Sequence, residues 1–490
     1  MRININRNEK TPLYLQISEQ IKNMIYEGSL TDGHTLPSER RLAKELNIHR
    51  NTVIRAYSDL KDEGLISSYQ GVGYSVSYRN MFYGMVKKPV NWEALVKDEY
   101  LGFSGDFDDL FSKTYDSDFI SFAGGVASRE IYPPGEIASV FERILTEQRE
   151  KAYFYTPYQG DSQLRKEIAD FMEKKGIVTD SGNIQIFSEN NQAIDFLFTL
   201  MLHPKDKVVV AEPLSPDIYR TVRMAGGKLL TVPMDKNGMI CDNLEALIEK
   251  ENPKFICVDS SFNNPTGALL SVERRKKLLE LSYKYRIPII EEDEGSELYF
   301  DDNRIPSIKS MDSGNNVVYM YSFSLTMMPG VGISFAVADN SLIKRLNKLV
   351  SMRLTALDWA PQMLLLEYMK EGLFSRRLEK FRENYAKKQI IMQKCLTNIK
   401  EEFNIKYELP GGGVYFWVKL PDGMSARALL TEAEKRGVTF IPGNIFYPKK
   451  SAGGSYIRLN YSYPTIEQIE EGMKRLHSAM KIVQQKIQIK

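Results

Sequence analysis

The segment from Val317 to Ala338, VVYMYSFSLTMMPGVGISFAVA, contains no charged residue. A membrane-spanning helix needs a steady apolar run of about 20 residues. Here Pro329-Gly330 interrupts the run, and four hydroxyl side chains lie within it: Ser322, Ser324, Thr326 and Ser334. The segment therefore predicts a strand, a turn rich in Ser and Thr, and a second buried strand.

Apolar runs typical of buried strands alternate with amphipathic helical patterns over residues 119–485. This alternation indicates an α/β architecture with a mostly parallel sheet. Clear strand-like runs are Lys207–Ala211, Phe255–Asp259 and Ile287–Glu291. A smaller α+β lobe follows Tyr385 and contains a strand at 413–420, a helix at 426–436 and a last helix opened by a capping-box pattern at 465–468.

Residues 1–78 have the pattern of three helices followed by two short strands. The first helix has one apolar face, formed by Leu13, Ile17, Ile21, Met24 and Ile25. Ser38 is suited to cap a second helix, and a third helix stops at Gly64. A glycine turn at Gly71 and Gly73 joins the strands. This is the plan of a winged helix-turn-helix, although an unrelated small helical domain has the same periodicity.

The placement of charge in this region favours a nucleic-acid partner. Between Arg40 and Arg55 there are five basic residues and one acid, Glu45. The basic residues lie on the second helix and at the start of the third, where a recognition helix meets phosphates and base edges. The formal net charge of the whole chain is only +2, so the local cluster carries this argument.

The totals exclude several other classes of protein. A chain of 490 residues is long enough for two to four domains, and residues 79–118, with mixed charge and no periodicity, predict a linker between them. Three cysteines without a CxxC pair exclude a disulfide framework, and four histidines without close spacing make a metal site unexpected. The N-terminus lacks the apolar core of a signal peptide. We therefore expect a cytoplasmic protein with no membrane partner.

The string LPSERRLAKELNIHRNTVIRAYSDLKDEGLISSYQGVGYSV resembles the DNA-binding domain of the GntR family over its whole length. The resemblance implies that double-stranded operator DNA is the partner. It assigns DNA-contacting positions to Arg40, Arg50, Thr52 and the wing glycines Gly71 and Gly73. We add two residues of the third helix to this predicted interface: Asn51 and Arg55.

Residues 119–485 resemble the fold-type I aminotransferases, and the match is closest to the MocR-type regulators of the GntR family. The motif is Ser322-Phe323-Ser324-x-Thr326 followed by Pro329-Gly330. In the family a lysine follows the second serine and holds pyridoxal phosphate, and an arginine follows the Pro-Gly pair and holds its phosphate. These two positions are Leu325 and Gly332 here.

Two residues match the family's ligand contacts. Asn264, in Asn264-Pro265-Thr266-Gly267, stands where the family contacts the cofactor ring oxygen, and Arg458 stands where it grips a substrate carboxylate. Each residue has a purely structural alternative. Asn264 is equally suited to be a turn residue before Pro265, and Arg458 to be a buried ion-pair partner.

Three further positions depart from the cofactor pattern. Glu292 replaces the Asp that pairs with the pyridine nitrogen, and Ser215 replaces an aromatic residue. Glu189 lies in the turn that would hold the phosphate, where its carboxylate repels that group. Loss of the lysine removes both the covalent link and the proton shuttle of transamination. The prediction is therefore a chain without covalently bound pyridoxal phosphate and without transaminase activity, while weak noncovalent binding of the cofactor stays open.

We accordingly predict a homodimeric transcriptional regulator whose large domain serves dimerisation and senses a carboxylate-bearing small molecule at Arg458. Three alternatives stay open. Another lysine could serve an ordinary pyridoxal-phosphate-dependent regulator, the chain could be an aminotransferase with an appended DNA-binding domain, or the large domain could be a dimerisation scaffold alone.

Overall fold

The computed structural model describes residues 1, 3–7, 9–69, 73–77, 105–132, 134–301, 304–449 and 452–488. The chain divides into two compact units, Met1–Lys97 and Asp98–Lys490. Gly71 and residues 79–104 of the predicted linker lie outside the described residues.

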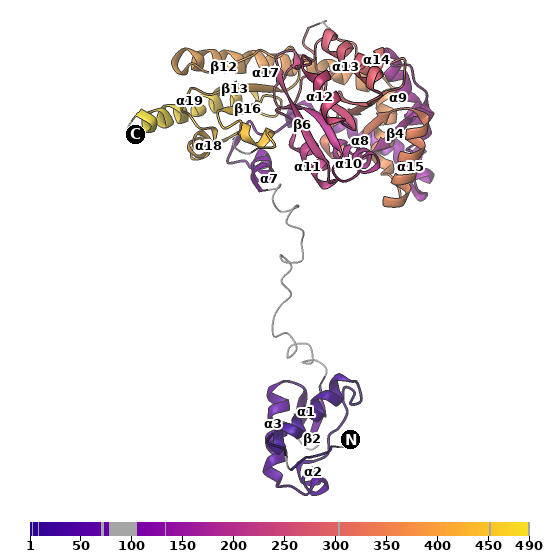
Figure 1. Cartoon of the computed structure of the whole chain (residues 1–490), viewed down its shortest axis with the longest axis vertical. Coiled ribbons are helices and arrows are strands. Elements are labelled where there is room, and N and C mark those ends of the chain that lie inside the picture. The colour runs from indigo at the N-terminus through magenta and orange to yellow at the C-terminus, as the bar shows by residue number, and fades with distance from the viewer. Residues whose placement is uncertain are drawn as a thin grey trace. The chain divides into compact units, whose positions relative to one another are not determined.

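The first unit contains three helices followed by an antiparallel hairpin (Figure 1). Its elements are α1 (Leu13–Tyr26), α2 (Glu39–Leu46), α3 (Arg50–Asp62), β1 (Ile66–Tyr69) and β2 (Gly73–Val76). Ile66 pairs with Val76 at the open end of the hairpin. Apolar residues from all three helices and both strands share one core. The predicted winged helix-turn-helix plan is confirmed.

Local hydrogen bonds fix the turn between α2 and α3. The Ser38 hydroxyl accepts a hydrogen bond from the Arg41 amide at 3.3 Å and caps α2, as the sequence predicts. Asn47 ends α2 in the left-handed region, with φ of 51°. The Tyr57 hydroxyl donates to the Pro37 carbonyl at 2.9 Å, which ties α3 to the segment before α2. These contacts set the angle at which α3 leaves the turn.

An eight-stranded sheet forms the centre of the second unit. Its order is β4-β11-β10-β9-β8-β5-β6-β7. Strands β10, β9, β8, β5 and β6 run parallel, while β4, β11 and β7 supply the antiparallel pairs at the edges. The bounds are β4 Ile184–Phe187, β5 Lys207–Glu212, β6 Lys228–Asp235, β7 Gly238–Met239, β8 Phe255–Asp259, β9 Ile289–Glu292, β10 Val317–Ser322 and β11 Ser334–Val337.

Helices cover both faces of this sheet (Figure 1). Alternate residues of β5 show this directly, because Val208 and Val210 belong to one apolar core and Val209 and Ala211 to another. Both cores include helical residues. The helices are α8 Pro134–Glu147, α9 Ser162–Lys174, α10 Asn190–Met201, α11 Pro216–Met224, α12 Leu244–Glu251, α13 Val272–Tyr285, α14 Ile308–Met311, α15 Asn340–Arg353 and α16 Trp359–Lys370. The predicted α/β architecture is confirmed.

The uncharged segment from Val317 to Ala338 forms a buried hairpin. Strands β10 and β11 pair antiparallel, with Ser322 opposite Ser334, and every residue of both strands is buried. A turn containing the short 3-10 helix Pro329–Val331 lies between them. The predicted strand, turn and strand are confirmed. Among the described residues, no helix is both long enough and apolar enough to span a bilayer.

A smaller lobe completes the second unit, in orange and yellow in Figure 1. The capping box at its last helix is confirmed, because the Thr465 and Gln468 side chains each accept the other's amide hydrogen, at 3.2 and 2.9 Å. The elements are α17 Leu373–Phe403, β12 Lys406–Tyr407, β13 Tyr415–Lys419, α18 Ala426–Glu434, β14 Val438–Thr439, β15 Ile441–Pro442, β16 Tyr456–Asn460 and α19 Ile466–Gln488.

The described end of the predicted linker packs against this lobe. It contains α7 (Gly105–Ser112), and the buried Leu110 belongs to the apolar core of the lobe. Lys113 pairs with Glu434 of α18 at 2.5 Å. Strand β3 (Ile120–Ser121) then pairs parallel with β14. Residues 105–118 are therefore ordered on the large unit.

Candidate functional site

The predicted DNA-contacting side chains lie at the surface of the first unit. Arg40 on α2 is exposed, as are Asn51 and Arg55 on α3, while Thr52 is half-buried. Asn51 and Arg55 are four residues apart and therefore share one face of α3. Gly73 opens β2 with φ of 97°, a conformation that favours glycine.

An acid just outside the basic cluster holds one of its arginines. The Arg50 guanidinium donates two hydrogen bonds to Glu39 Oε2, at 2.7 and 3.2 Å, and Tyr74 of β2 donates to the other oxygen at 3.3 Å. Arg40 and Lys44 form no ion pair with any residue that the structure describes. These two cations are therefore the ones most available to phosphates.

Arg55 is placed differently from the other predicted contacts. Its guanidinium carbon lies 3.9 Å from the ring centroid of Tyr14 on α1. A cation over an aromatic face is held by about 0.5–1 kcal/mol at an exposed site. Arg55 therefore gives up this weak contact with α1 if its side chain turns toward DNA.

A pocket of about 230 Å³ lies at the carboxyl ends of the central strands of the second unit. Asp259 ends β8, Glu292 ends β9 and Ser322 ends β10. Ligands of open α/β sheets bind outside the carboxyl ends of the strands, so this is the expected place for a small molecule. Five residues singled out in the sequence line the pocket: Glu189, Ser215, Asn264, Glu292 and Leu325.

The pocket is acidic. Five of its twenty lining residues are Asp or Glu, and none of the lining residues that the structure describes is Lys, Arg or His. Burial is the main cause that raises the pKa of Glu292 to about 7 and that of Glu294 to about 7. Burial and the neighbouring Glu292 raise the pKa of Asp259 well above its usual value. A hydrogen bond from Asn190 Nδ2 to Glu292, at 2.8 Å, partly opposes the shift there.

Arg458 lies outside the lining of the pocket. It is 2% exposed, and its guanidinium donates to Asn264 Oδ1 at 2.9 Å and to the carbonyls of Ala123 and Gly124 at 2.6 and 3.1 Å. Burial lowers the pKa of Arg458. The two predicted ligand contacts thus bond to each other, and Arg458 ties β16 to the segment after β3.

Backbone oxygens lie close to two glycines near the pocket, one of which, Gly332, stands at the position of the family's phosphate-binding arginine. A Cβ at Gly332 would lie 2.6 Å from the Ser188 carbonyl oxygen, and one at Gly295 would lie 2.5 Å from the Ser261 carbonyl oxygen. Neither position can take a side chain without a backbone shift. At Gly332 the chain therefore lacks both the arginine that the resemblance implies and the space for its side chain. Leu325 packs against the apolar core of the small lobe.

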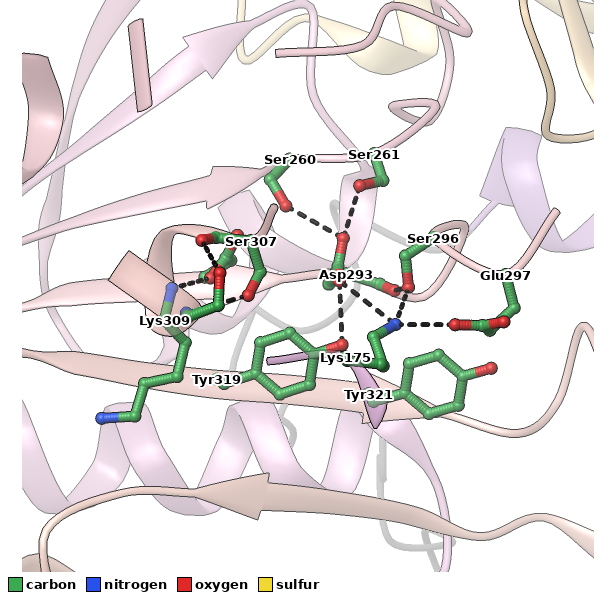
Figure 2. Close-up of polar contacts among 12 residues, drawn as sticks. Lys175, Ser260, Ser261, Asp293, Ser296, Glu297, Ser307, Lys309, Tyr319 and Tyr321 are labelled. Carbon is green, nitrogen blue, oxygen red and sulfur yellow. Dashed lines mark hydrogen bonds and ion pairs between the residues drawn. The ribbon is translucent and has the colours of Figure 1, made fainter. Parts of the chain in front are cut away.

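Two other lysines of the second unit, Lys175 and Lys309, are held by acids outside this pocket (Figure 2). Lys175 lies 3.1 Å from Glu297 and 3.6 Å from Asp293, in a separate pocket. Lys309, which the sequence places beyond a loop, pairs with Asp312 at 3.2 Å. Asp293 also accepts hydrogen bonds from Ser260, Ser261 and Tyr319. Neither lysine lines the acidic pocket.

Sequence reasoning missed three acids of the pocket: Asp217, Asp259 and Glu294. Asp259 is opposite Glu292 in the β8–β9 register, so the sheet order brings the two together. The sequence did contain one indication of this role, because Asp259 comes at the end of a buried apolar run. In the part of the chain that the structure describes, no group of three or more His, Cys, Asp or Glu is arranged to hold a metal ion.

A winged helix-turn-helix joined to an aminotransferase-like α/β unit defines a class of DNA-binding regulators. Comparison with known families agrees with the assignment of both units. Residues 13–76 match the family of bacterial regulatory proteins called the gntR family, and residues 128–476 match the aminotransferase class I and II family. The chain belongs to the MocR-type regulators of the GntR family, with a class I and II aminotransferase domain.

Similar proteins fall into two groups. An uncharacterized HTH-type transcriptional regulator of Bacillus subtilis, YdfD, is 28% identical over 96% of both chains. The 2-aminoadipate transaminase of Thermus thermophilus is 34% identical over 80% of this chain and 98% of its own. The crystal structure of LysN, an alpha-aminoadipate aminotransferase of Thermus thermophilus, matches with a TM-score of 0.74 and 30% identity, over 80% of this chain and 99% of that one.

The LysN structure contains N-(5'-phosphopyridoxyl)-L-leucine. The residues of the acidic pocket do not fit that group. They offer no lysine for a covalent bond and no cation for a phosphate. Glu189 instead places a carboxylate at the N-terminus of α10, where a helix attracts an anion.

Proposed function

We propose that the protein regulates transcription by binding operator DNA as a homodimer, and that its aminotransferase-like unit works without covalently bound pyridoxal phosphate and without transaminase activity. The observation that carries the second part is the charge of the pocket: five carboxyl groups and no basic side chain among its described lining residues. A doubly charged phosphate is repelled there, more strongly in a low dielectric than in water. A DNA-binding role also implies a cytoplasmic location.

The DNA contacts follow from the first unit. The N-terminal end of α3 enters the major groove, Asn51 and Thr52 face base edges, and Arg40 with Lys44 neutralise phosphates. Arg50 exchanges its bond to Glu39 for a phosphate or a base. The hairpin of β1 and β2, with the turn at Gly71 and Gly73, rests on the backbone or in the minor groove.

Exposed aromatic residues support the proposed dimer. Tyr153, Phe154 and Tyr155 are consecutive and are 73%, 77% and 78% exposed. A run of large apolar side chains at the surface is typical of a protein interface. Burial against a second copy would remove this surface from water, and a closed pair presents two recognition helices to a two-fold operator.

A selection experiment tests the DNA-binding part. The full chain selects a site from a random double-stranded pool, and fluorescence anisotropy then measures affinity at several salt concentrations. Arg40→Ala, on α2, is compared with Lys61→Ala, which removes a cation near the C-terminal end of α3, away from the proposed interface. We expect weaker binding for Arg40→Ala and unchanged binding for Lys61→Ala. Equal effects of the two substitutions would contradict the proposed interface.

The identity to a transaminase supports a second candidate function, an aminotransferase with an appended DNA-binding domain. Conversion of an amino-acid donor by the full chain with added pyridoxal phosphate would establish it. The carboxylate-bearing effector predicted from Arg458 is a further proposal, and it requires Arg458 to release Asn264 first. Amino acids and keto acids that leave both thermal stability and DNA affinity unchanged would remove that proposal.

A further inference from the structure

The acidic pocket has the charge of a site for a cation. Asp259 and Glu292 are neighbours across the β8–β9 pair, and Glu294 follows two residues later. Asp217 lies at the start of α11 and Glu189 at the start of α10. These acids come from four different elements or loops and line one cavity. Carboxylates are acceptors only, so they suit a ligand that brings donors and positive charge.

A second observation independent of these acids points to a ligand. Tyr415 lines the same pocket and is only 7% exposed, yet its hydroxyl forms no hydrogen bond with any residue that the structure describes. One face of its ring is covered by Arg458, with the guanidinium carbon 4.4 Å from the ring centroid. The hydroxyl of Tyr415 is therefore a free polar group beside the acids.

We propose that this pocket binds a small organic cation, a primary amine or diamine that carries neither a carboxylate nor a phosphate. The cavity of about 230 Å³ suits a molecule of a few heavy atoms. An ammonium group has three donors, which match the carboxyl groups of Glu292, Glu294 and Asp259. The described residues include no group arranged to hold a metal ion, which favours an organic cation over an inorganic one.

This inference rests on the proposed function, in which the pocket holds no covalent pyridoxal phosphate, and it names an amine as effector in place of the carboxylate-bearing molecule predicted from Arg458. The position is the one that the fold family uses for an anionic cofactor, and the charge is reversed. Glu189 stands where a phosphate would lie, and Glu292 and Glu294 line the space beyond it. A cation removes the repulsion among these carboxylates, whereas an anion increases it.

The state of the carboxyl groups predicts how binding depends on pH. Burial raises the pKa of Glu292 and Glu294 to about 7 without a ligand. The groups that face them are Asn190 on α10, Asp217 on α11, Asp259 on β8, Ser322 on β10 and Tyr415 on β13. A bound ammonium favours the ionised carboxylates, so binding releases protons. Amine affinity therefore increases from pH 6 to pH 8, a range in which the amine itself stays protonated.

Isothermal titration calorimetry of the full chain tests the proposal. The probes are 1,4-diaminobutane and n-butylamine, with butyrate and pyridoxal phosphate as anionic comparisons. The variants Glu292→Gln and Glu294→Gln each remove one pocket carboxyl, and Glu142→Gln makes the same change at an exposed position on α8. We expect one of the amines to bind the natural chain. Its affinity should be at least tenfold lower in each pocket variant and unchanged in the control. For the natural chain, the affinity should be several-fold higher at pH 8 than at pH 6.

Three results would each overturn the proposal: no heat from either amine at millimolar concentration, unchanged amine affinity in both pocket variants, or preferential binding of butyrate or pyridoxal phosphate. The pocket variants remove repulsion, so we expect both to fold. The titration uses no DNA, so a failure of operator binding is detected separately. Anisotropy on the selected operator, with and without the amine, then reports whether the bound amine changes DNA affinity.

Discussion

Replacing Glu292 by glutamine should stabilise the protein at neutral pH and leave it almost unchanged at acid pH. The amide oxygen of glutamine keeps the hydrogen bond from Asn190, which is 2.8 Å long in the natural chain. The substitution removes only the charge. Near Glu292 that charge faces the acids Asp217, Asp259 and Glu294.

The magnitude follows from the pKa of Glu292, which burial raises from 4.5 to about 7. One pKa unit corresponds to about 1.4 kcal/mol, so the full shift corresponds to an upper limit of about 3 kcal/mol. The side chain is half-buried, and solvent screening reduces this to about 1–2 kcal/mol. A raised carboxyl pKa means that Glu292 keeps its proton up to a higher pH in the native state than in the unfolded state. The natural chain therefore loses this stability as pH rises from about 4.5 through about 7.

The assay is chemical unfolding of the full chain at pH 5 and pH 8, with Glu142→Gln as the matched control. The stability gap between Glu292→Gln and the natural chain should widen by about 1–2 kcal/mol between these pH values. The control should show no such widening. A gap of equal size at both pH values, or a larger gap at pH 5, would refute the idea that Glu292 is held in an unfavourable acidic pocket.

Three further substitutions have expected outcomes. Arg40→Ala should lower the slope of log affinity against log salt by about one unit if this side chain contacts a phosphate, as measured on the selected operator. Arg275→Met should destabilise the second unit by about 3–5 kcal/mol in urea unfolding, because Arg275 and Glu291 are fully buried and lie 3.4 Å apart. Gly295→Ala should cost about 1–3 kcal/mol, since its Cβ would press on the Ser261 carbonyl; an unchanged unfolding midpoint would contradict this.

Local patterns predicted much of the fold. The hairpin from Val317 to Ala338 follows from its apolar run and its Pro-Gly break, and the cap of α19 follows from Thr465 and Gln468. Such features depend on neighbours in sequence, which a single chain displays directly. The packing of the described part of the predicted linker was less accessible from sequence, because Leu110 and Lys113 contact distant elements such as α18.

The site was harder to predict because its members meet only through the sheet. Asp259 and Glu292 become neighbours through the β8–β9 pairing, which the sequence does not state. The lack of space for a side chain at Gly332 could not be predicted either, because the obstructing carbonyl oxygen belongs to Ser188, which is distant in sequence. In the first unit the charge pattern identified the basic cluster but overlooked that Glu39 holds Arg50, an ion pair between two helices.

An absorbance titration of the full chain with pyridoxal phosphate tests the central claim most directly. It is run beside Leu325→Lys and followed by borohydride reduction and peptide mapping. We expect no reducible Schiff-base band in the natural chain. The variant should also lack tight binding, because Glu189 places a carboxylate in the predicted phosphate turn and the Ser188 carbonyl oxygen leaves no space for a side chain at Gly332. A reducible band that maps to a lysine of the natural chain would contradict the account and establish an ordinary pyridoxal-linked regulator.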